Sequence, residues 1–173
     1  MNPDRLRVYL LNLPHVVETM QWGANLVFWT GDKAIGGKMF ALVNLEDPAP
    51  DGASPERRRV THHALMMYSA GQDRYSDLLE LDGLIPAPYM ARIHWVAAER
   101  WDVFTPAEWQ RELLAAHALT LAKLPKKVLA TLALPAAAQR HLISARRKEL
   151  ARRKELARRK ELAGRKPAPK AKK

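Results

Sequence analysis

The sequence contains no cysteine in its 173 residues. This absence excludes disulfide bonds, thiolate nucleophiles and cysteine-based zinc sites, and it is consistent with a reducing compartment. No uninterrupted apolar run approaches the ~20 residues that a membrane-spanning helix needs. The first residues also lack the basic segment followed by an apolar one that is typical of a secretory signal peptide. We therefore expect a soluble protein of the cytoplasm.

Positive charge is distributed unevenly along the chain. Of 29 Lys and Arg and 18 Asp and Glu, residues 135–173 hold 15 basic and 3 acidic side chains, a net charge of +12. Residues 1–134 keep 14 basic and 15 acidic side chains, a net charge of −1. The formal +11 of the chain therefore belongs to residues 135–173, here called the basic tail, which follow a nearly neutral domain of residues 1–134.

Apolar periodicity predicts a mixed fold for the domain. Strands are expected where β-branched and aromatic residues lie between turn signals, and helices where apolar residues recur at helical spacing. The predicted strands are 16–21, 25–30, 38–45, 59–67 and 93–98, and the predicted helices are 3–13, 73–81 and 105–124. Segments 46–57 and 84–90, which are rich in proline, are expected to be irregular.

Local signals support the helix ends and the fold class. Asn2 is a suitable N-cap before Pro3, and Thr105 with Glu108 forms the pattern of a capping box. Strands that follow one another without intervening helices indicate an α+β fold rather than a parallel doubly wound sheet. We expect an antiparallel sheet whose apolar face is covered by the first helix and the long one.

Seven short strings occur in order within residues 4–128. They are Leu13-Pro14 with Glu18, Trp22-Gly23, Leu26-Val27-Phe28, Lys38-Met39-Phe40-Ala41, Pro86-Ala87-Pro88-Tyr89-Met90, His94-Trp95-Val96 and Lys123-Leu124-Pro125-Lys126. Through these strings the chain resembles the MmcQ/YjbR family of small bacterial proteins. The resemblance implies a compact α+β fold of the frataxin/CyaY type and DNA binding through a double wing of hairpins. Frataxins carry an acidic ridge on the first helix, whereas this helix offers Asp4 alone, so we expect no metal and no cofactor.

The basic tail contains the hexad Ala-Arg-Arg-Lys-Glu-Leu three times, beginning at Ala145, Ala151 and Ala157. Six residues advance an α-helix by about 600°, so equivalent residues of successive hexads point about 120° apart. This phase gives neither the apolar seam of a coiled coil nor the apolar face of a membrane-surface helix. The tail is therefore predicted to be a helix over 144–163 with positive charge on every side.

Two glutamates of the predicted helix stand four residues before an arginine, Glu149 before Arg153 and Glu155 before Arg159. This order favours (i, i+4) ion pairs. The helix is expected to end near Gly164, and residues 165–173 are expected to be disordered.

The natural partner of a cationic rod is a polyanion, because each bound phosphate releases condensed counterions. The predicted nucleic-acid contacts are Arg146, Arg147, Lys148, Arg152, Arg153, Lys154, Arg158, Arg159, Lys160, Arg165 and Lys166. One alternative is that the tail is solvated and only aids solubility. Another is that it binds an acidic lipid surface, for which it offers no apolar anchor.

The domain offers weaker candidates. Five of its cations are predicted to form a modest basic patch on the sheet edge and helix end: Lys33, Lys38, Arg92, Lys126 and Lys127. His62 and His63 would point to opposite faces of a strand, so no metal site is expected. His15, His94 and His117 are interpreted as surface or core residues, and Gly36-Gly37-Lys38 as a hairpin turn rather than a phosphate loop.

No nucleophile, base and acid occur together, so an enzyme is not expected. The leading hypothesis is a protein of the cytoplasm or the nucleoid that binds nucleic acid, DNA rather than RNA, largely independently of sequence. The alternative is a protein-interaction or small-ligand module whose tail only localises it to RNA or the nucleoid. A pocket lined by Trp22, Lys38, Tyr89 and Trp95 would favour that alternative.

Overall fold

The computed structural model describes residues 3–45 and 64–164, which form six strands and five α-helices. The chain divides into two compact units, unit 1 (residues 1–132) and unit 2 (residues 133–173). Several predictions lie outside the described residues. They are the Asn2 cap, the 46–57 loop, the His62-His63 pair with the first part of the fourth strand, and residues 165–173 with Arg165 and Lys166.

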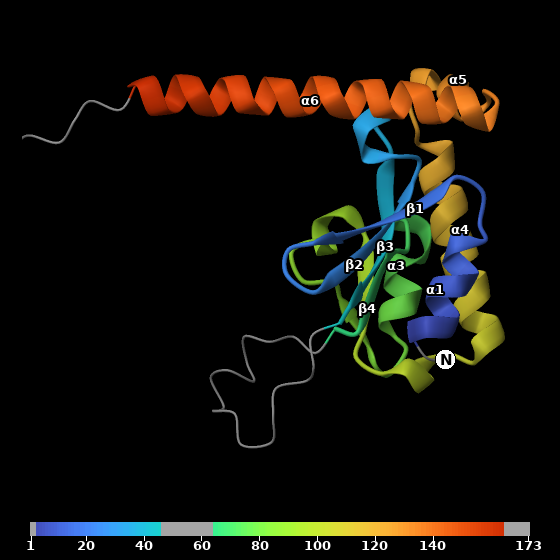
Figure 1. The fold of residues 1–173 in the computed structure, drawn as a ribbon. Helices are drawn as coiled ribbons and strands as arrows, with labels where there is room; N and C mark the ends of the chain where they lie inside the picture. Colours follow the sequence, from blue (N-terminus) through green and yellow to red (C-terminus); the bar gives the residue numbers. More distant parts are fainter. Residues whose placement is uncertain (1–2, 46–63, 165–173) are drawn as a thin grey trace, which may run out of the picture. The chain divides into compact units, whose positions relative to one another are not determined.

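Unit 1 is built on one antiparallel sheet (Figure 1). The strands are β1 (Val16–Gln21), β2 (Asn25–Thr30), β3 (Lys38–Asn44), β4 (Met66–Ser69), β5 (Leu84–Pro86) and β6 (Trp95–Ala98). Their order across the sheet is β1-β2-β3-β4-β6-β5, so β1 and β5 form the two edges. The predicted α+β class with an antiparallel sheet is confirmed.

Three helices cover one face of this sheet: α1 (Pro3–Leu11), α3 (Gln72–Leu79) and α4 (Pro106–Ala122) (Figure 1). They bury the main core, in which Leu6 of α1 and Trp109 of α4 pack with Phe28 and Tyr68 of the sheet. The Thr105–Glu108 capping box that starts α4 is confirmed, with both reciprocal hydrogen bonds present. The first helix and the long helix therefore cover the sheet as predicted.

The opposite face of the sheet is also apolar. Val27, Trp29 and Leu42 form a second buried cluster there with Trp95 of β6. Ala87, which lies in the connection from β5 to β6, joins the same cluster. Because the central strands are buried on both faces, their sequences read as continuous apolar runs rather than as strict alternation.

Three strand predictions need correction. The fourth strand was predicted over 59–67, but β4 spans Met66–Ser69, where pairing with β3 and β6 sets its register. The 84–90 segment was predicted to be irregular, but Leu84–Pro86 forms β5 against β6. Proline is compatible with an edge strand because the missing N–H need not be part of the ladder. Finally, β6 begins at Trp95 rather than 93, because His94 adopts a left-handed conformation (φ 57°) after the short 3₁₀-helix η2 (Ala91–Ile93).

After α4 the chain forms α5 (Lys126–Leu132), which is part of unit 1. Its Val128 and Leu132 pack with Leu124 and with Ile35, which lies in the 3₁₀-helix η1 (Lys33–Ile35) between β2 and β3. This small core fixes α5 at the end of the sheet where β2 ends and β3 begins.

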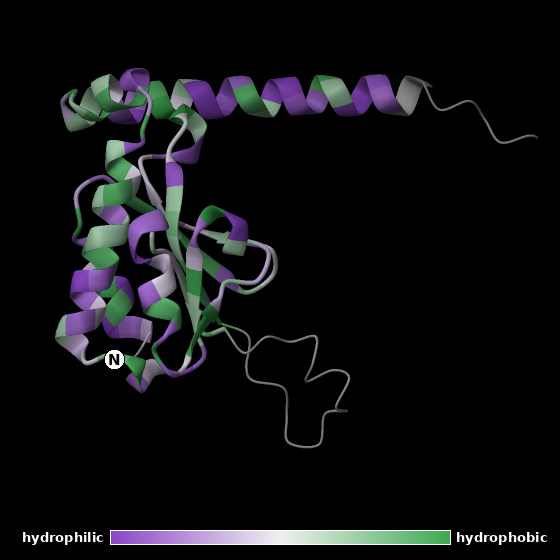
Figure 2. Ribbon diagram, turned by 180° about the vertical axis from the view of Figure 1, so that it is seen from behind, coloured by the Kyte–Doolittle hydropathy of each residue, from purple (hydrophilic) through white to green (hydrophobic). Residues whose placement is uncertain are grey.

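Unit 2 contains α6 (Ala136–Gly164), a 29-residue helix. The helix begins eight residues earlier than predicted, directly after Pro135. At this end Gln139 Nε2 donates to the carbonyl oxygen of Leu134 at 2.7 Å, which satisfies one carbonyl near the helix start. In Figure 2 the hydrophilic colouring extends along most of the hexad segment and is interrupted only at isolated positions. No helix in residues 3–45 and 64–164 is both long and apolar enough to cross a membrane.

Candidate nucleic-acid interface

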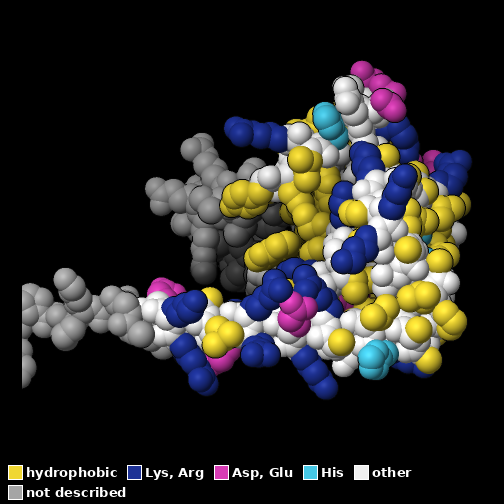
Figure 3. All heavy atoms as spheres, turned by 90° about the horizontal axis from the view of Figure 1, so that it is seen from above, with side chains coloured by type: hydrophobic (Ala, Val, Ile, Leu, Met, Phe, Trp, Pro, Cys, Tyr) yellow, Lys and Arg dark blue, Asp and Glu magenta, His cyan; other side chains and the backbone are white. Residues whose placement is uncertain are grey.

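The hexad segment of α6 is exposed over most of its described length, and only Arg146 and Glu149 in it are partly buried. Every described side chain from Ala151 to Glu161 is exposed, and in Figure 3 Lys and Arg side chains project from both sides of the helix axis. Leu150 and Leu156 are 40% and 48% exposed and point about 120° apart. The helix therefore presents cations around its circumference without an apolar stripe.

Both predicted (i, i+4) ion pairs are confirmed. Arg153 pairs with Glu149, and Arg159 Nε donates to Glu155 Oε1 at 2.9 Å. Arg146 also binds Glu149, and this hydrogen bond is the main reason that the pKa of the Glu149 carboxyl lies below its usual value.

Five other cations of the hexads make no ion pair with a described residue of α6. They are Lys148, Arg152, Lys154, Arg158 and Lys160. Because no carboxylate neutralises them, they are the cations best placed to bind phosphates. Arg165 and Lys166, which belong to the predicted contacts, lie beyond the described residues.

Four of the five lysines and arginines predicted to form the patch on unit 1 lie at one end of the sheet. Lys33 is in η1, Lys38 begins β3 opposite Thr30 at the end of β2, and Lys126 and Lys127 begin α5. The η1 and α5 elements pack through the Ile35 cluster, which brings these lysines together although about 90 residues separate them in sequence. We call Lys33, Lys38, Lys123, Lys126 and Lys127 the lysine end of unit 1.

Lys123 was not predicted from the sequence. It follows α4, and its carbonyl oxygen accepts a hydrogen bond from Lys38 Nζ at 2.8 Å. This contact places a cation at the C-terminal end of α4, where the helix dipole favours positive charge. The string Lys-Leu-Pro-Lys around Pro125 contains two of the lysines, but only the contact with β3 shows that Lys123 belongs to the group.

Arg92 does not belong to the lysine end. It lies on η2, which leads into β6, and β4 separates β6 from β3 in the sheet. Two strand spacings, roughly 10 Å, therefore lie between the starts of β3 and β6. The packing that joins η1 and α5 does not include η2, so the place of Arg92 in the basic patch stays a prediction.

The loop that carries Lys33 is held in shape by two glycines. A Cβ on Gly37 would lie 1.9 Å from the carbonyl oxygen of Gly31, so only glycine permits this approach. Asp32 accepts a hydrogen bond from the Ala34 N–H at 2.8 Å and begins η1. Lys33 Nζ lies 5.3 Å from the centre of the Trp29 ring, within the range of a cation–π contact. The Gly36-Gly37 segment is thus a structured strand connection, in agreement with the predicted hairpin turn.

The pocket predicted for the alternative function is not formed by its four residues. Trp22 lies in the β1–β2 turn next to Asn25, while Lys38 pairs with Thr30 at the other end of β2. Six residues of strand separate these ends, roughly 17 Å. Trp95 is buried in the second cluster, and Tyr89 is fully exposed.

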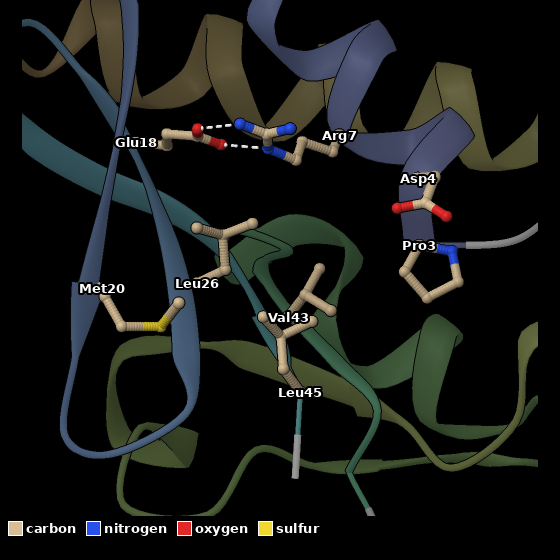
Figure 4. A pocket seen from close by; sticks show the side chains of 8 residues that line it. All are labelled: Pro3, Asp4, Arg7, Glu18, Met20, Leu26, Val43 and Leu45. Carbon is tan, nitrogen blue, oxygen red and sulfur yellow. Dashed lines mark hydrogen bonds and ion pairs between the residues drawn. The ribbon is translucent and has the colours of Figure 1, made fainter. Parts of the chain in front are cut away.

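A different pocket lies between α1 and the first three strands, with a volume of about 370 Å³. It is lined by Pro3, Asp4, Arg7, Glu18, Met20, Leu26, Val43 and Leu45 (Figure 4). Arg7 binds Glu18 through two hydrogen bonds, one of them from Nε to Oε2 at 2.7 Å. This bond to Glu18 raises the pKa of Arg7 above its usual value. The pocket combines apolar side chains of the strands with charged side chains from α1 and with Glu18 of β1.

The histidines do not form a site. His117 is 3% exposed, its Nε2–H donates to the carbonyl oxygen of Pro14 at 3.0 Å, and its ring meets Phe40 edge-on. His94 meets Tyr75 in the same way, and His15 lies at the surface. These placements agree with the prediction of surface and core histidines. Within residues 3–45 and 64–164 no three His, Asp or Glu side chains are grouped to hold a metal ion.

His117 makes the stability of unit 1 dependent on pH. Burial is the main cause that lowers the pKa of His117, the bond to Pro14 opposes it, and His15 adds to it. The folded protein therefore keeps His117 neutral at a pH where the unfolded chain, with a pKa of about 6.5, begins to bind a proton. This contribution to stability is complete above about pH 6.5 and is lost as the pH falls through the range below it.

We expect the free energy of unfolding by urea to fall more between about pH 7.5 and pH 5.5 for the wild type than for His117→Gln. Glutamine can donate to the Pro14 carbonyl but does not titrate. Equal pH dependence of the two proteins would mean that His117 titrates alike in the folded and unfolded states.

The fold defines a class, that of α+β domains in which helices cover one face of an antiparallel sheet. A model of the YjbR family matches residues 11–119, and the chain belongs to this family. The crystal structure of the Deinococcus radiodurans protein DR2400, a DUF419 domain, is similar, with a TM-score of 0.58 and 22% sequence identity. The similarity covers 76% of this chain and 88% of that one, and at this identity it concerns the fold alone. No curated protein matches the chain.

Proposed function

We propose that the protein binds nucleic acid, with duplex DNA as the preferred partner. Binding is largely independent of base sequence, and the protein does not catalyse a reaction. The single observation that carries the proposal is the exposed, all-round cationic surface of α6. Five of its described cations lack a carboxylate partner in the described helix, and no apolar stripe competes for a protein or lipid partner. Phosphate contacts of this kind position a protein on DNA but do not read bases.

The lysine end supports a smaller contribution from unit 1. Five lysines converge there in a domain whose net charge is −1, so the rest of the domain is net acidic. Asp32, the acidic neighbour of Lys33 in the sequence, is buried, and its carboxylate accepts a hydrogen bond from the Ala34 N–H of η1. A local positive field on an otherwise acidic surface orients a polyanion towards that end.

The proposal includes a finer description of unit 1 as a frataxin/CyaY-like scaffold with a double wing of hairpins. Helices packed on one face of an antiparallel sheet and the β1–β2 hairpin support this description. It also includes association with the nucleoid, which would follow from the affinity of α6 for DNA. The second candidate function, a small-ligand or protein-interaction module, is favoured by the pocket beside α1.

The proposal is tested by the salt dependence of binding. For the full chain and a fluorescently labelled duplex, contact with about 6–8 phosphates predicts a slope of log K against log salt of about −5 to −7. Duplexes of the same length and different sequence should give the same affinity within about a factor of three, because no base contacts are invoked. Fluorescence anisotropy measures both quantities. A slope near zero, or the absence of binding at low salt, would refute the proposal.

A further inference from the structure

We propose that the free edge of β1, together with the pocket beside α1, binds an extended peptide segment that carries basic side chains. The site is built from residues of unit 1 alone, and the proposal does not depend on nucleic-acid binding. Its mode is β-augmentation, in which a partner adds a strand to a sheet edge and a neighbouring pocket selects its side chains.

The first observation is the open edge. β1 is the outermost strand of the sheet, and no strand of the described residues pairs with its outer side. Proteins usually protect such edges with proline, lysine or a very short strand. The opposite edge strand, β5, has only three residues and ends at Pro86, whereas β1 has six residues without proline or lysine. β1 is therefore available for pairing in a way that β5 is not.

The second observation is the direction of the backbone groups. The Gly31 N–H donates to the carbonyl oxygen of His15 at 2.8 Å, which fixes the phase of the β1–β2 ladder. In an antiparallel ladder the hydrogen-bonded pairs alternate with pairs whose groups point outward. The odd-numbered residues of β1 therefore bond to β2. The N–H and C=O groups of Glu18 and Met20 point away from the sheet, where a new strand would meet them.

The third observation is that the pocket lies on the side to which these same residues project. The side chains of Glu18 and Met20 line it (Figure 4). Leu26 of β2, which pairs with Met20, and Val43 of β3, which pairs with Leu26, also line it. Paired residues of neighbouring strands place their side chains on the same face. Peptide residues opposite Glu18 and Met20 would therefore project towards the pocket. Met20 is 54% exposed, so its contact with a partner would bury apolar surface.

The charges of the pocket select the partner. Of the two carboxylates that line the pocket, Glu18 is paired with Arg7. The other, Asp4, is exposed and makes no ion pair with a described residue. Asp4, Arg7 and Glu18 together give the pocket a net charge of −1. An arginine or lysine side chain suits this arrangement, because its aliphatic part can lie on Met20 and Leu26 while its charge reaches the carboxylates.

The test uses the full chain and a blocked hexapeptide of sequence Thr-Arg-Thr-Leu-Thr-Arg, whose alternate side chains are basic or apolar. At about 0.15 M salt the basic tail repels this probe, so binding cannot be attributed to the overall charge of the protein. Isothermal titration calorimetry should show saturable one-to-one binding with a Kd on the order of 0.1 mM. Absence of saturable binding up to millimolar peptide would overturn the proposal.

Two N-methylated forms of the probe test the mode of binding. One carries methyl groups on the amides of the three threonines and the other on the amides of the remaining three residues. Only one of the two sets can face β1, so one form should lose binding and the other should bind within about threefold of the parent peptide. Equal loss or equal retention would exclude strand addition.

Two variants at one position test the edge itself. Met20→Pro removes the outward N–H without removing a bond to β2, and it should weaken binding of the probe at least about tenfold. Met20→Val keeps the N–H and is the matched control, with an expected change of less than about threefold. Asp4→Asn should weaken binding by about two- to fivefold, as expected for an exposed charge pair. Unchanged urea unfolding and unchanged DNA affinity of Met20→Pro would show that its fold is intact. Equal affinity of the two Met20 variants would contradict the proposal.

Discussion

A chain that ends at Leu134 is expected to bind duplex DNA at least about a hundredfold more weakly than the full chain at about 50 mM salt. The truncation removes all 15 basic residues of the tail and leaves a domain of net charge −1. Few phosphate contacts then remain, so the salt slope should also fall to about −2 or less in magnitude. Electrophoretic mobility shift at two salt concentrations measures both effects. If the truncated chain bound as tightly as the full chain, the tail would not be the source of affinity.

Two matched double variants of the full chain separate charge from helix integrity. Arg152→Gln with Arg158→Gln removes two cations without an ion pair, and it should reduce the magnitude of the salt slope by about two. Glu149→Gln with Glu155→Gln changes the same helix to the same extent but releases the paired arginines, so affinity should rise. Glutamine, glutamate and arginine have similar helix propensities, which keeps the backbone comparable. A loss of affinity in both proteins would point to helix disruption rather than charge.

The largest effect on stability is expected for Trp109→Ala, which should lower the free energy of unfolding by about 3–5 kcal/mol. Trp109 is fully buried and packs against Tyr68, Trp101 and Phe104. Its indole N–H donates to the carbonyl oxygen of Trp101 at 2.9 Å, so the substitution removes a hydrogen bond as well as the packing. A single domain has about 5–15 kcal/mol of stability, and urea unfolding followed by circular dichroism would show the loss directly.

Trp22→Ala is the control for this measurement. Trp22 is 64% exposed in the β1–β2 turn, so its removal should change the free energy of unfolding by less than about 0.5 kcal/mol. Equal destabilisation by the two tryptophan substitutions would mean that the main core is not centred on α4.

The parts of the fold that the sequence predicted well are those specified by local signals. β1 and β2 occur at their predicted bounds, because segments rich in β-branched and aromatic residues lie on either side of the Trp22-Gly23 turn. The capping box of Thr105 and Glu108 marks the start of α4, because it depends only on two residues three positions apart in the sequence. β5 was missed because its three residues carry no pattern of their own, and it exists through pairing with β6.

In the candidate site, too, some features follow from local sequence and others depend on tertiary contacts. The cations of α6 and the two ion pairs from Glu149 and Glu155 follow from the helical period, which relates residues four positions apart. The grouping of Lys38 with Lys123 could not be predicted, because it depends on α4 ending beside the start of β3. The position of Arg92 relative to these lysines likewise depends on the sheet order, in which β4 lies between β3 and β6.

The sequence by itself determined the location of the charge and the phase of the hexads, because both depend only on neighbours along one helix. It also determined the α+β class through the order of its elements. Only the tertiary structure decided which distant residues meet, including Arg7 with Glu18 and the pocket that both line. Such contacts depend on strand register and on the packing of α1 against the sheet. These are set by the burial of the whole core, and no local pattern encodes them.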